Sequence, residues 1–171
     1  GLANFVGYFA FGVAVASTIG KGVVGVEFIT LPILVSALLG AILWNIITWL
    51  IGLPTSSSHA LIGGLVGAAL ASAGAKAIIL AGLLKIVAFI VIAPVLGWLG
   101  AVIFTNLTLL IARKARPAKA NRTFKLLQLF SAASYAVAHG TNDAQKSMGI
   151  IALALVAGGV TKDFSLTGPN E

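Results

Sequence analysis

The sequence contains no cysteine and little charge: 4 Asp and Glu, 11 Lys and Arg, and 9% charged residues in a chain of 171. The absence of cysteine excludes disulfides, thiolate metal sites and cysteine nucleophiles together. Because ordinary soluble domains carry about 25% charged residues, an ordinary soluble domain is excluded as well. The hydrophobic content of 59% also excludes disorder. The formal net charge is +7, and its location decides whether it points to nucleic acid.

Three long stretches of the chain have no charged residue: 1–20, 28–75 and 86–112. About 20 apolar residues cross a hydrocarbon core of about 30 Å as a helix. The stretches therefore predict an all-α, polytopic helical membrane protein, with spans over 2–19 and 26–53. The apolar run 77–112 is too long for one straight crossing, so we expect it to tilt strongly or to break at Pro94 and Gly97.

The basic residues gather in one segment, because 113–125 holds six of the eleven and no acidic residue. Pro117 and Asn121 predict that this segment is a loop rather than a helix. Positively charged loops stay in the cytoplasm during membrane insertion, so we expect 113–125 to be cytoplasmic. A topology signal accounts for most of the net charge, and binding of anionic lipid headgroups is the second interpretation. Nucleic acid is not an expected partner.

The first polar interruption of the apolar sequence is Pro54-Thr55-Ser56-Ser57-Ser58-His59. Pro54 favours a break, and the hydroxyl residues can cap a helix that begins near His59. The apolar run 60–73 is short for a full crossing, which predicts a half-helix or re-entrant segment with a small glycine face for close packing. Hydroxyls beside a helix N-terminus suit a tetrahedral oxyanion. The alternative is a plain N-cap, although a cap needs one hydroxyl rather than four.

The second interruption, from His139 to Ser147, divides the apolar run 126–160. Asp143 with its neighbouring amides offers oxygen ligands for a small cation, or a proton site. Gly140 would let the backbone unwind there. Lys146 follows Asp143 by three residues and shares its helix face, so the alternative is a self-neutralised pair that holds helices together. We expect Lys85 to snorkel or to pair inside a bundle rather than to bind substrate.

Both interruptions resemble the signatures of the inorganic phosphate transporter (PiT) family, bacterial type. Its Pro-Ser/Thr-Ser-x-Ser-His segment is matched at 54–59, and its Gly-Ala/Thr-Asn-Asp element is matched by Gly140-Thr141-Asn142-Asp143. The resemblance covers essentially the whole chain. It implies a secondary carrier of about twice this length, built from two inverted repeats with discontinuous helices. In that organisation 1–112 is part of the first repeat with the Ser-rich re-entrant element, 113–125 is the cytoplasmic loop, and 126–171 begins the second repeat.

The resemblance implies cation-coupled transport of inorganic phosphate across a bacterial inner membrane, with no enzymatic activity and no catalytic residue. The coupling cation would be a proton or sodium, or a divalent metal carried with the phosphate, and no resident metal or other cofactor is expected. Membrane lipid is the other expected partner, and a homo-oligomer is left open. The residues implied to bind phosphate are Thr55, Ser56, Ser57, Ser58, Thr141, Asn142, Asp143, Gln145 and Lys146. Asn142 and Asp143 are also implied to bind the coupling ion.

One residue departs from the family's pattern, which has a second Asn where this chain has Lys146. An ammonium competes with a bound cation, so we hypothesise that Lys146 replaces a sodium ligand and favours proton coupling or metal-phosphate cotransport. The alternative substrate is another tetrahedral oxyanion such as sulfate. An alternative of a different class is an intramembrane serine hydrolase using one of Ser56–Ser58 with His59 or His139, although the Gly-x-Ser-x-Gly turn is missing. A purely structural bundle would leave the hydroxyl run unexplained.

Overall fold

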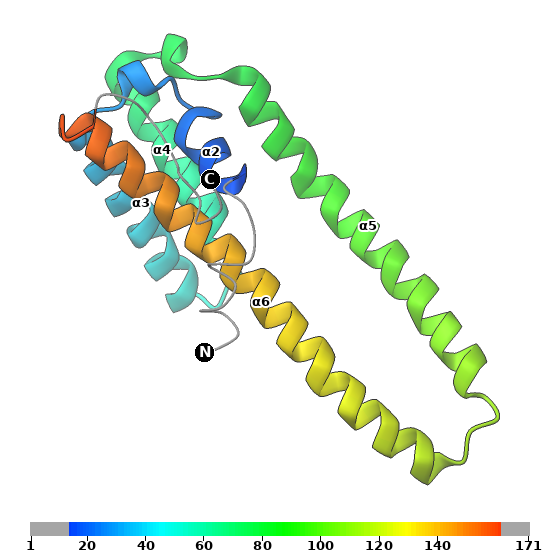
Figure 1. The fold of residues 1–171 in the computed structure, drawn as a ribbon. Helices are drawn as coiled ribbons and strands as arrows, with labels where there is room; N and C mark the ends of the chain where they lie inside the picture. Colours follow the sequence, from blue (N-terminus) through cyan, green and yellow to red (C-terminus); the bar gives the residue numbers. More distant parts are fainter. Residues whose placement is uncertain (1–13, 162–171) are drawn as a thin grey trace.

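The computed structural model describes residues 14–161, and all of the regular secondary structure in that range is helical (Figure 1). This result confirms the predicted all-α class. Most of the predicted span 2–19 lies outside the described residues. The helices are α2 (Ala14–Lys21), α3 (Leu31–Leu50), α4 (Ser57–Ala73), α5 (Leu80–Ala112) and α6 (Pro117–Ala157), with 3₁₀ turns η1 (Val26–Phe28) and η2 (Ala75–Ala77).

Two of the described helices, α3 and α5, are long and apolar enough to cross a membrane by length and composition. The 33 residues of α5 make it about 50 Å long. Pro32 lies in the first turn of α3, where a missing N–H costs nothing, so it starts the helix rather than kinking it. α4 has 17 residues and is a shorter apolar helix, as the short run 60–73 predicted.

The packed end of the molecule is formed by α3 against α4 and by α2 against α6 (Figure 1). Gly64 of α4 lets the first pair approach closely, because a Cβ built on it would lie 2.4 Å from the carbonyl oxygen of Ala37 in α3. Gly149 of α6 does the same for the second pair, since its Cβ would lie 2.9 Å from the carbonyl oxygen of Ala16. The predicted small face is therefore used at Gly64. The buried cluster at this end comprises Val23, Val24, Ile29, Ile33, Leu34, Ala37, Leu65, Ala69, Ala77 and Leu153.

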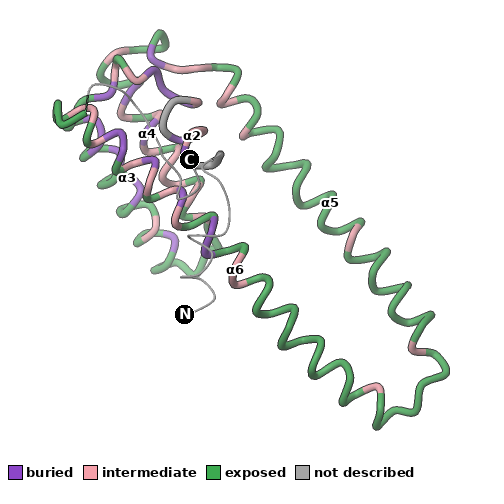
Figure 2. Tube along the Cα trace, viewed as in Figure 1, coloured by how far each residue is buried: buried purple, intermediate pink, exposed green. Residues whose placement is uncertain are grey.

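The other end of the molecule is a long hairpin of α5 and the first half of α6, which projects away from the packed end (Figures 1 and 2). α5 has no buried residue, and all six buried residues of α6 lie at or beyond Gly140. The hairpin therefore presents bare apolar surface, as expected for helices that lie against lipid or against other helices.

Two predicted interruptions are wrong, and of the two expectations for 77–112, a tilt or a break, the break does not occur. α5 continues through Pro94, and α6 continues through the polar segment 139–147 without unwinding at Gly140. α6 also begins at Pro117, so the connection between these helices is 113–116 and not the whole of 113–125. Proline suits the first turn of a helix. Inside an apolar environment a continuous helix keeps backbone groups paired, which outweighs the local preference of Pro94 or Gly140.

Candidate functional site

The connection between α3 and α4 places hydroxyl side chains at the start of α4. Ser56 is the N-cap residue, and its Oγ accepts the backbone N–H of His59 at 3.4 Å. The first backbone bond of α4 runs from the Ala60 N–H to the Ser56 carbonyl at 3.0 Å. The N–H groups of Ser57 and Ser58 precede that bond, so this end carries the positive pole of the helix. The predicted cap is confirmed at Ser56, and the helix begins two residues before the predicted start near His59.

The polar segment of α6 presents different side chains on different faces of one helix. Thr141 and Gln145 are buried, four residues apart, and Gly149 continues their row against α2. The Thr141 hydroxyl donates to the carbonyl of Val137 at 2.9 Å, within the helix. Asp143 and Lys146 lie on another face of α6, toward the start of α4. The helix therefore separates two of the predicted binding residues from the others.

Lys146 joins the two polar segments that the sequence places 88 residues apart. Its ammonium donates to Ser58 Oγ at 2.7 Å and also to Asp143 Oδ1. The Lys146 side chain is 17% exposed, so it is largely enclosed between the helices, whereas Asp143 is half-exposed. The Lys146 ammonium thus bridges the Ser58 hydroxyl at the N-terminal end of α4 and Asp143, the only acidic side chain within α6.

Asp143 has a second partner on its own helix. His139 Nε2 lies 3.1 Å from Asp143 Oδ2, and the His139 ring stacks on Tyr135 with centroids 6.0 Å apart. The carboxylate is thus held between an ammonium and an imidazole. Its charge is balanced locally by Lys146 as long as no other ion is bound.

A cavity of about 290 Å³ opens beside this cluster, between α3, α4 and α6. We call it the Ser57 cavity. Its polar lining comes from Asn45, Ser57, Asp143, Lys146 and Ser147, and its apolar lining from Leu38, Ala41, Ile42 and Leu61. The cavity offers hydroxyl, amide and ammonium donors to an anion, and carboxylate and amide oxygens to a cation.

A larger cavity of about 630 Å³ lies on the α5 side of α6. We call it the Lys85 cavity. Its polar lining is Thr18, His59, Lys85 and Asn142, and the rest is the apolar face of α5 from Ile86 to Pro94. Asn142 and Asp143 are adjacent in sequence, yet they line different cavities because neighbouring helical residues point about 100° apart.

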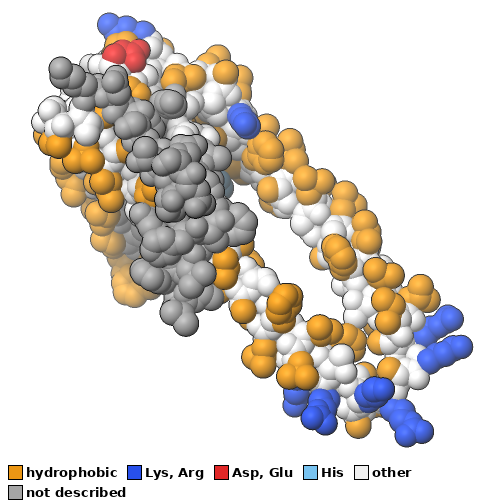
Figure 3. Space-filling model, viewed as in Figure 1, with side chains coloured by type: hydrophobic (Ala, Val, Ile, Leu, Met, Phe, Trp, Pro, Cys, Tyr) orange, Lys and Arg blue, Asp and Glu red, His pale blue; other side chains and the backbone are white. Residues whose placement is uncertain are grey.

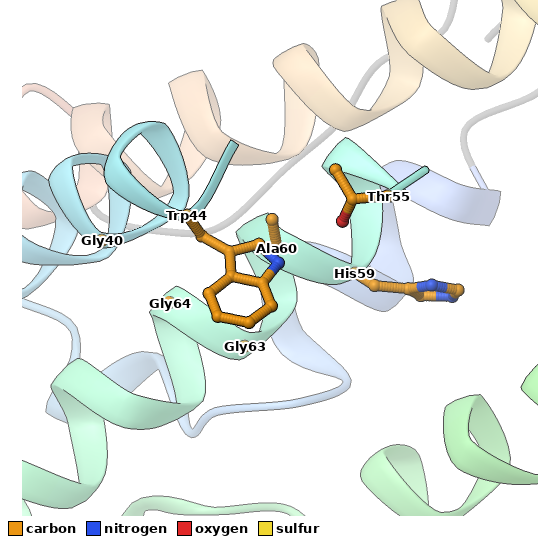
Figure 4. A pocket seen from close by; sticks show the side chains of 7 residues that line it. All are labelled: Gly40, Trp44, Thr55, His59, Ala60, Gly63 and Gly64. Carbon is orange, nitrogen blue, oxygen red and sulfur yellow. The ribbon is translucent and has the colours of Figure 1, made fainter. Parts of the chain in front are cut away.

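A third cavity, of about 380 Å³, lies over the glycine face of α4. We call it the Trp44 cavity. Figure 4 shows the Trp44 indole beside Gly63 and Gly64, with Thr55 nearby and the His59 ring pointing away from the indole. His59 lines both this cavity and the Lys85 cavity. Thr55 is therefore placed on the α3–α4 surface rather than beside Lys146.

The structure brings together only part of the predicted set. Ser57, Ser58, Asp143 and Lys146 meet at one place. Ser56 caps α4, Thr55 lines the Trp44 cavity, and Asn142 lines the Lys85 cavity. Thr141 and Gln145 are buried along the face of α6 that includes Gly149.

Five polar residues of the Ser57 and Lys85 cavities were missed as ion- or phosphate-binding candidates: Asn45, Ser147, Thr18, His59 and Lys85. Asn45 lies in the apolar helix α3 and lines the Ser57 cavity, and a lone amide at membrane depth was a signal that could have identified it. Lys85 was expected to snorkel or to pair, yet it lines the cavity that contains Asn142. Its position on α5 carries no pattern that predicts this neighbour.

The described part of the chain, 14–161, contains no group of three or more His, Cys, Asp or Glu side chains that could hold a metal ion. Within this range Ser56 Oγ accepts from the His59 backbone N–H, and Ser58 Oγ accepts from Lys146 Nζ. No hydrogen bond in this range joins Ser56, Ser57 or Ser58 to an imidazole. The geometry therefore supplies oxygen and ammonium groups for ions, and it does not form the Ser–His pair of the hydrolase alternative.

Apolar helices, a short helix with hydroxyls at its start and a polar cluster between helices together define a helical membrane protein with polar groups inside its helix bundle. A solved structure described as "The sodium-dependent phosphate transporter" has the same fold, with a TM-score of 0.80, 22% identity and 99% of this chain aligned to 60% of that chain.

Sequence comparisons identify the family. The phosphate transporter family matches residues 1–167. A "Probable low-affinity inorganic phosphate transporter" of Rhizobium meliloti (strain 1021) is 45% identical over 156 residues, which are 91% of this chain and 47% of the relative. The protein of the same name from Bacillus subtilis (strain 168) is 43% identical over 157 residues, 90% of this chain and 46% of the relative. This chain belongs to the phosphate transporter family, as its two motifs predicted, and it spans about half the length of these relatives.

Proposed function

We propose that the intact protein transports inorganic phosphate across a bacterial membrane together with a cation. The observation that carries this proposal is the bridge from Lys146 to both Ser58 and Asp143, which joins an anion-binding helix end to a carboxylate. The family match and the names of the relatives support phosphate as the substrate. Sulfate has the same tetrahedral shape and remains the alternative to test by competition.

Phosphate would dock in the Ser57 cavity, against Ser57, Ser58 and the first N–H groups of α4. A helix N-terminus and hydroxyl donors stabilise a tetrahedral oxyanion. Lys146 already donates to Ser58 at 2.7 Å, so it can reach an anion bound beside that hydroxyl. Charge-assisted hydrogen bonds of this type are about twice as strong as neutral ones.

The same lysine would link phosphate binding to a cation. When Lys146 turns its charge toward phosphate, Asp143 keeps only the His139 imidazole beside it, and a carboxylate at membrane depth without its ammonium partner is costly. A proton or a metal ion on Asp143 removes that cost, so anion and cation bind together. Asp143 is half-exposed and faces the Ser57 cavity, which gives the cation access.

We propose that the cation is a proton, or a metal ion carried with phosphate, because the ammonium of Lys146 occupies the place of a sodium ligand. The structural relative described as sodium-dependent makes sodium the alternative. From the resemblance to the phosphate transporter family we also propose that 1–112 is part of a first repeat and that 126–171 begins a second, so that the site combines residues of both repeats.

Replacement of Lys146 by the family's usual Asn tests this proposal. The intact protein and its Lys146→Asn variant are reconstituted in liposomes, and labelled phosphate uptake is followed with and without sodium at fixed internal and external pH. We expect sodium to leave the native protein's uptake unchanged and to stimulate the variant. Thr108→Val is the control, because Thr108 lies on exposed α5 and donates to its own helix, at Phe104. Sodium-stimulated uptake by the native protein would contradict proton or metal-phosphate coupling.

The distance between Lys146 and Ser58 also fits a serine–lysine hydrolase, and this alternative has a direct test. A lysine that acts as a general base must be neutral, whereas Lys146 is ion-paired with Asp143. We therefore expect a fluorophosphonate probe to leave Ser58 unlabelled in the intact protein. Labelling that is lost in Ser58→Ala would favour the hydrolase.

A further inference from the structure

The tip of the α5–α6 hairpin carries a cluster of positive side chains, and none of them forms an ion pair with the two acidic residues of 14–161, Glu27 and Asp143. Figure 3 shows the Lys and Arg side chains gathered at this end of the molecule, beyond a long apolar surface. Asp143 is 18 residues beyond Lys125 on α6, which is about 27 Å along the helix. That separation exceeds a Debye length of about 8 Å in physiological salt. Asp143 therefore does not neutralise the cluster.

The tip is folded into a hollow and not merely charged. Ala115 N–H donates to the Ala112 carbonyl at 2.8 Å, and α6 begins at once with Pro117. This tight connection and the adjoining ends of α5 and α6 line an open cavity of about 550 Å³. Three of the six cations of 113–125 line it: Lys114, Arg116 and Lys119. The other three, Arg113, Arg122 and Lys125, do not.

The same cavity has a hydrophobic wall on the side of the helices. Ile111 of α5 and Phe124 and Leu127 of α6 line it, and their exposed fractions are 75%, 41% and 54%. Thr123 adds a hydroxyl beside the cations. A positively charged rim above an apolar wall, at the end of two apolar helices, has the polarity of a phospholipid at a membrane surface.

We propose that this cavity, which we call the hairpin-tip cavity, binds the phosphate headgroup of an anionic phospholipid. Lys114, Arg116 and Lys119 pair with the headgroup, and Arg116 can donate two parallel hydrogen bonds to phosphate oxygens. The acyl chains lie along Ile111, Phe124 and Leu127. Free inorganic phosphate presents the same oxygens but would leave this apolar wall in water, so the lipid is the occupant that satisfies both parts of the cavity.

A topology signal alone does not require this arrangement. Loop orientation depends on how many Lys and Arg flank a span, and all six cations contribute to that count. Only three of them line the cavity together with an apolar wall, and this selection is an additional property of the folded hairpin. The three cations that line the cavity and the three that do not carry the same total charge. Comparing the two sets therefore distinguishes a lipid-binding site from a topology signal.

The test compares two triple variants of the intact protein in nanodiscs that contain phosphatidylglycerol in phosphatidylcholine. One variant is Lys114→Gln, Arg116→Gln and Lys119→Gln, and the control is Arg113→Gln, Arg122→Gln and Lys125→Gln. Native mass spectrometry counts phosphatidylglycerol retained per protein after extraction. With about 1 kcal/mol for each cation at a membrane surface, we expect the cavity variant to bind this lipid about a hundredfold more weakly and the control to change far less. Equal losses in the two variants would overturn the proposal in favour of diffuse attraction.

A second pair of variants keeps all six cations and so protects membrane topology. Thr123→Glu puts a carboxylate into the hairpin-tip cavity, and Asn121→Glu puts one on the same helix without lining it. We expect lipid retention to fall in Thr123→Glu and to persist in Asn121→Glu. Unchanged retention in Thr123→Glu contradicts the site. Displacement of the lipid by millimolar glycerol phosphate or inorganic phosphate would assign the cavity to soluble anions instead.

Discussion

The two halves of α6 differ in how far their residues are buried and in whether their charged side chains are paired. From Pro117 to His139 the helix has no buried residue, whereas from Gly140 onward it buries six and meets α2, α3 and the start of α4. The polar residues follow the same division. Among residues 14–161 the cations at the tip of the bare half form no ion pair, whereas the packed half carries Asp143 and Lys146 in contact with each other and with α4. Within the described residues, charges are thus paired where helices pack and not at the hairpin tip.

This contrast indicates where a substitution acts on transport and where it acts on packing or lipid. In the packed half Asp143 and Lys146 bond each other and Lys146 bonds Ser58, so the loss of one of these side chains changes a neighbour as well. In the bare half the same substitution removes only contacts within one helix. Matched variants in the two halves therefore measure how much contacts with neighbouring helices add to the effect of a substitution.

The largest effect is expected for Asp143→Asn. The variant keeps the volume of the side chain but removes the charge that balances Lys146, and with it the group that we propose accepts the coupling cation. We expect concentrative phosphate uptake in proteoliposomes to be abolished, with normal amounts of protein in the membrane. Asn106→Ala on α5 is the control, because its amide donates to Val102 of the same exposed helix and should leave uptake near the native rate. Native uptake in Asp143→Asn would rule out Asp143 as the coupling residue.

A pair of glycine substitutions compares the packing of the two ends. In Gly64→Ala the new Cβ would lie 2.4 Å from the Ala37 carbonyl oxygen, so α3 and α4 must separate. Overpacking of this type costs about 1–3 kcal/mol. Gly97→Ala on α5 meets nothing within 4 Å, and alanine favours a helix over glycine by about 1 kcal/mol. Thermal unfolding of the intact protein in detergent should therefore shift down for Gly64→Ala and up, or not at all, for Gly97→Ala. A downward shift of equal size in both would mean that α5 is packed as tightly as α4.

The membrane class and the Ser56 cap could be predicted because both depend on local sequence. Low charge content is a property of composition, and the break before Ser57 follows from Pro54 and from side chains that cap their own helix. Pro117 starts α6 because proline suits the first turn of a helix. The breaks considered at Pro94 and Gly140 are absent for a different reason. Local breaking preferences were given more weight than the cost of leaving backbone groups unpaired in an apolar environment.

The arrangement of the site was less predictable than its residue types. The sequence indicated the Ser-rich segment and the Asp143 segment but not that Lys146 connects them, because a contact across 88 residues depends on the packing of α4 against α6. The sequence also grouped Asn142 with Asp143. A continuous helix directs these neighbours into different cavities, and only a helix that unwinds at Gly140 would have allowed them to share one.

The smallest effect is expected for Ser58→Ala, which removes the hydroxyl that accepts from Lys146 at 2.7 Å. Lys146 keeps Asp143 as a partner, so no charge is left unpaired. A hydrogen bond to a charged group contributes about 1.5–3 kcal/mol, and because Lys146 keeps Asp143 as a partner we expect the lower end, a rise of about tenfold in the half-saturation concentration for phosphate with coupling intact. Ser134→Ala is the matched control on the bare half of α6, because the Ser134 hydroxyl donates only to Phe130 of its own helix. If both alanines change phosphate affinity equally, the Ser58→Ala effect comes from the helix at whose start Ser58 lies and not from a contact with the anion. If only Ser58→Ala changes the affinity, the contact between Ser58 and Lys146, which joins distant parts of the sequence, is part of the phosphate site.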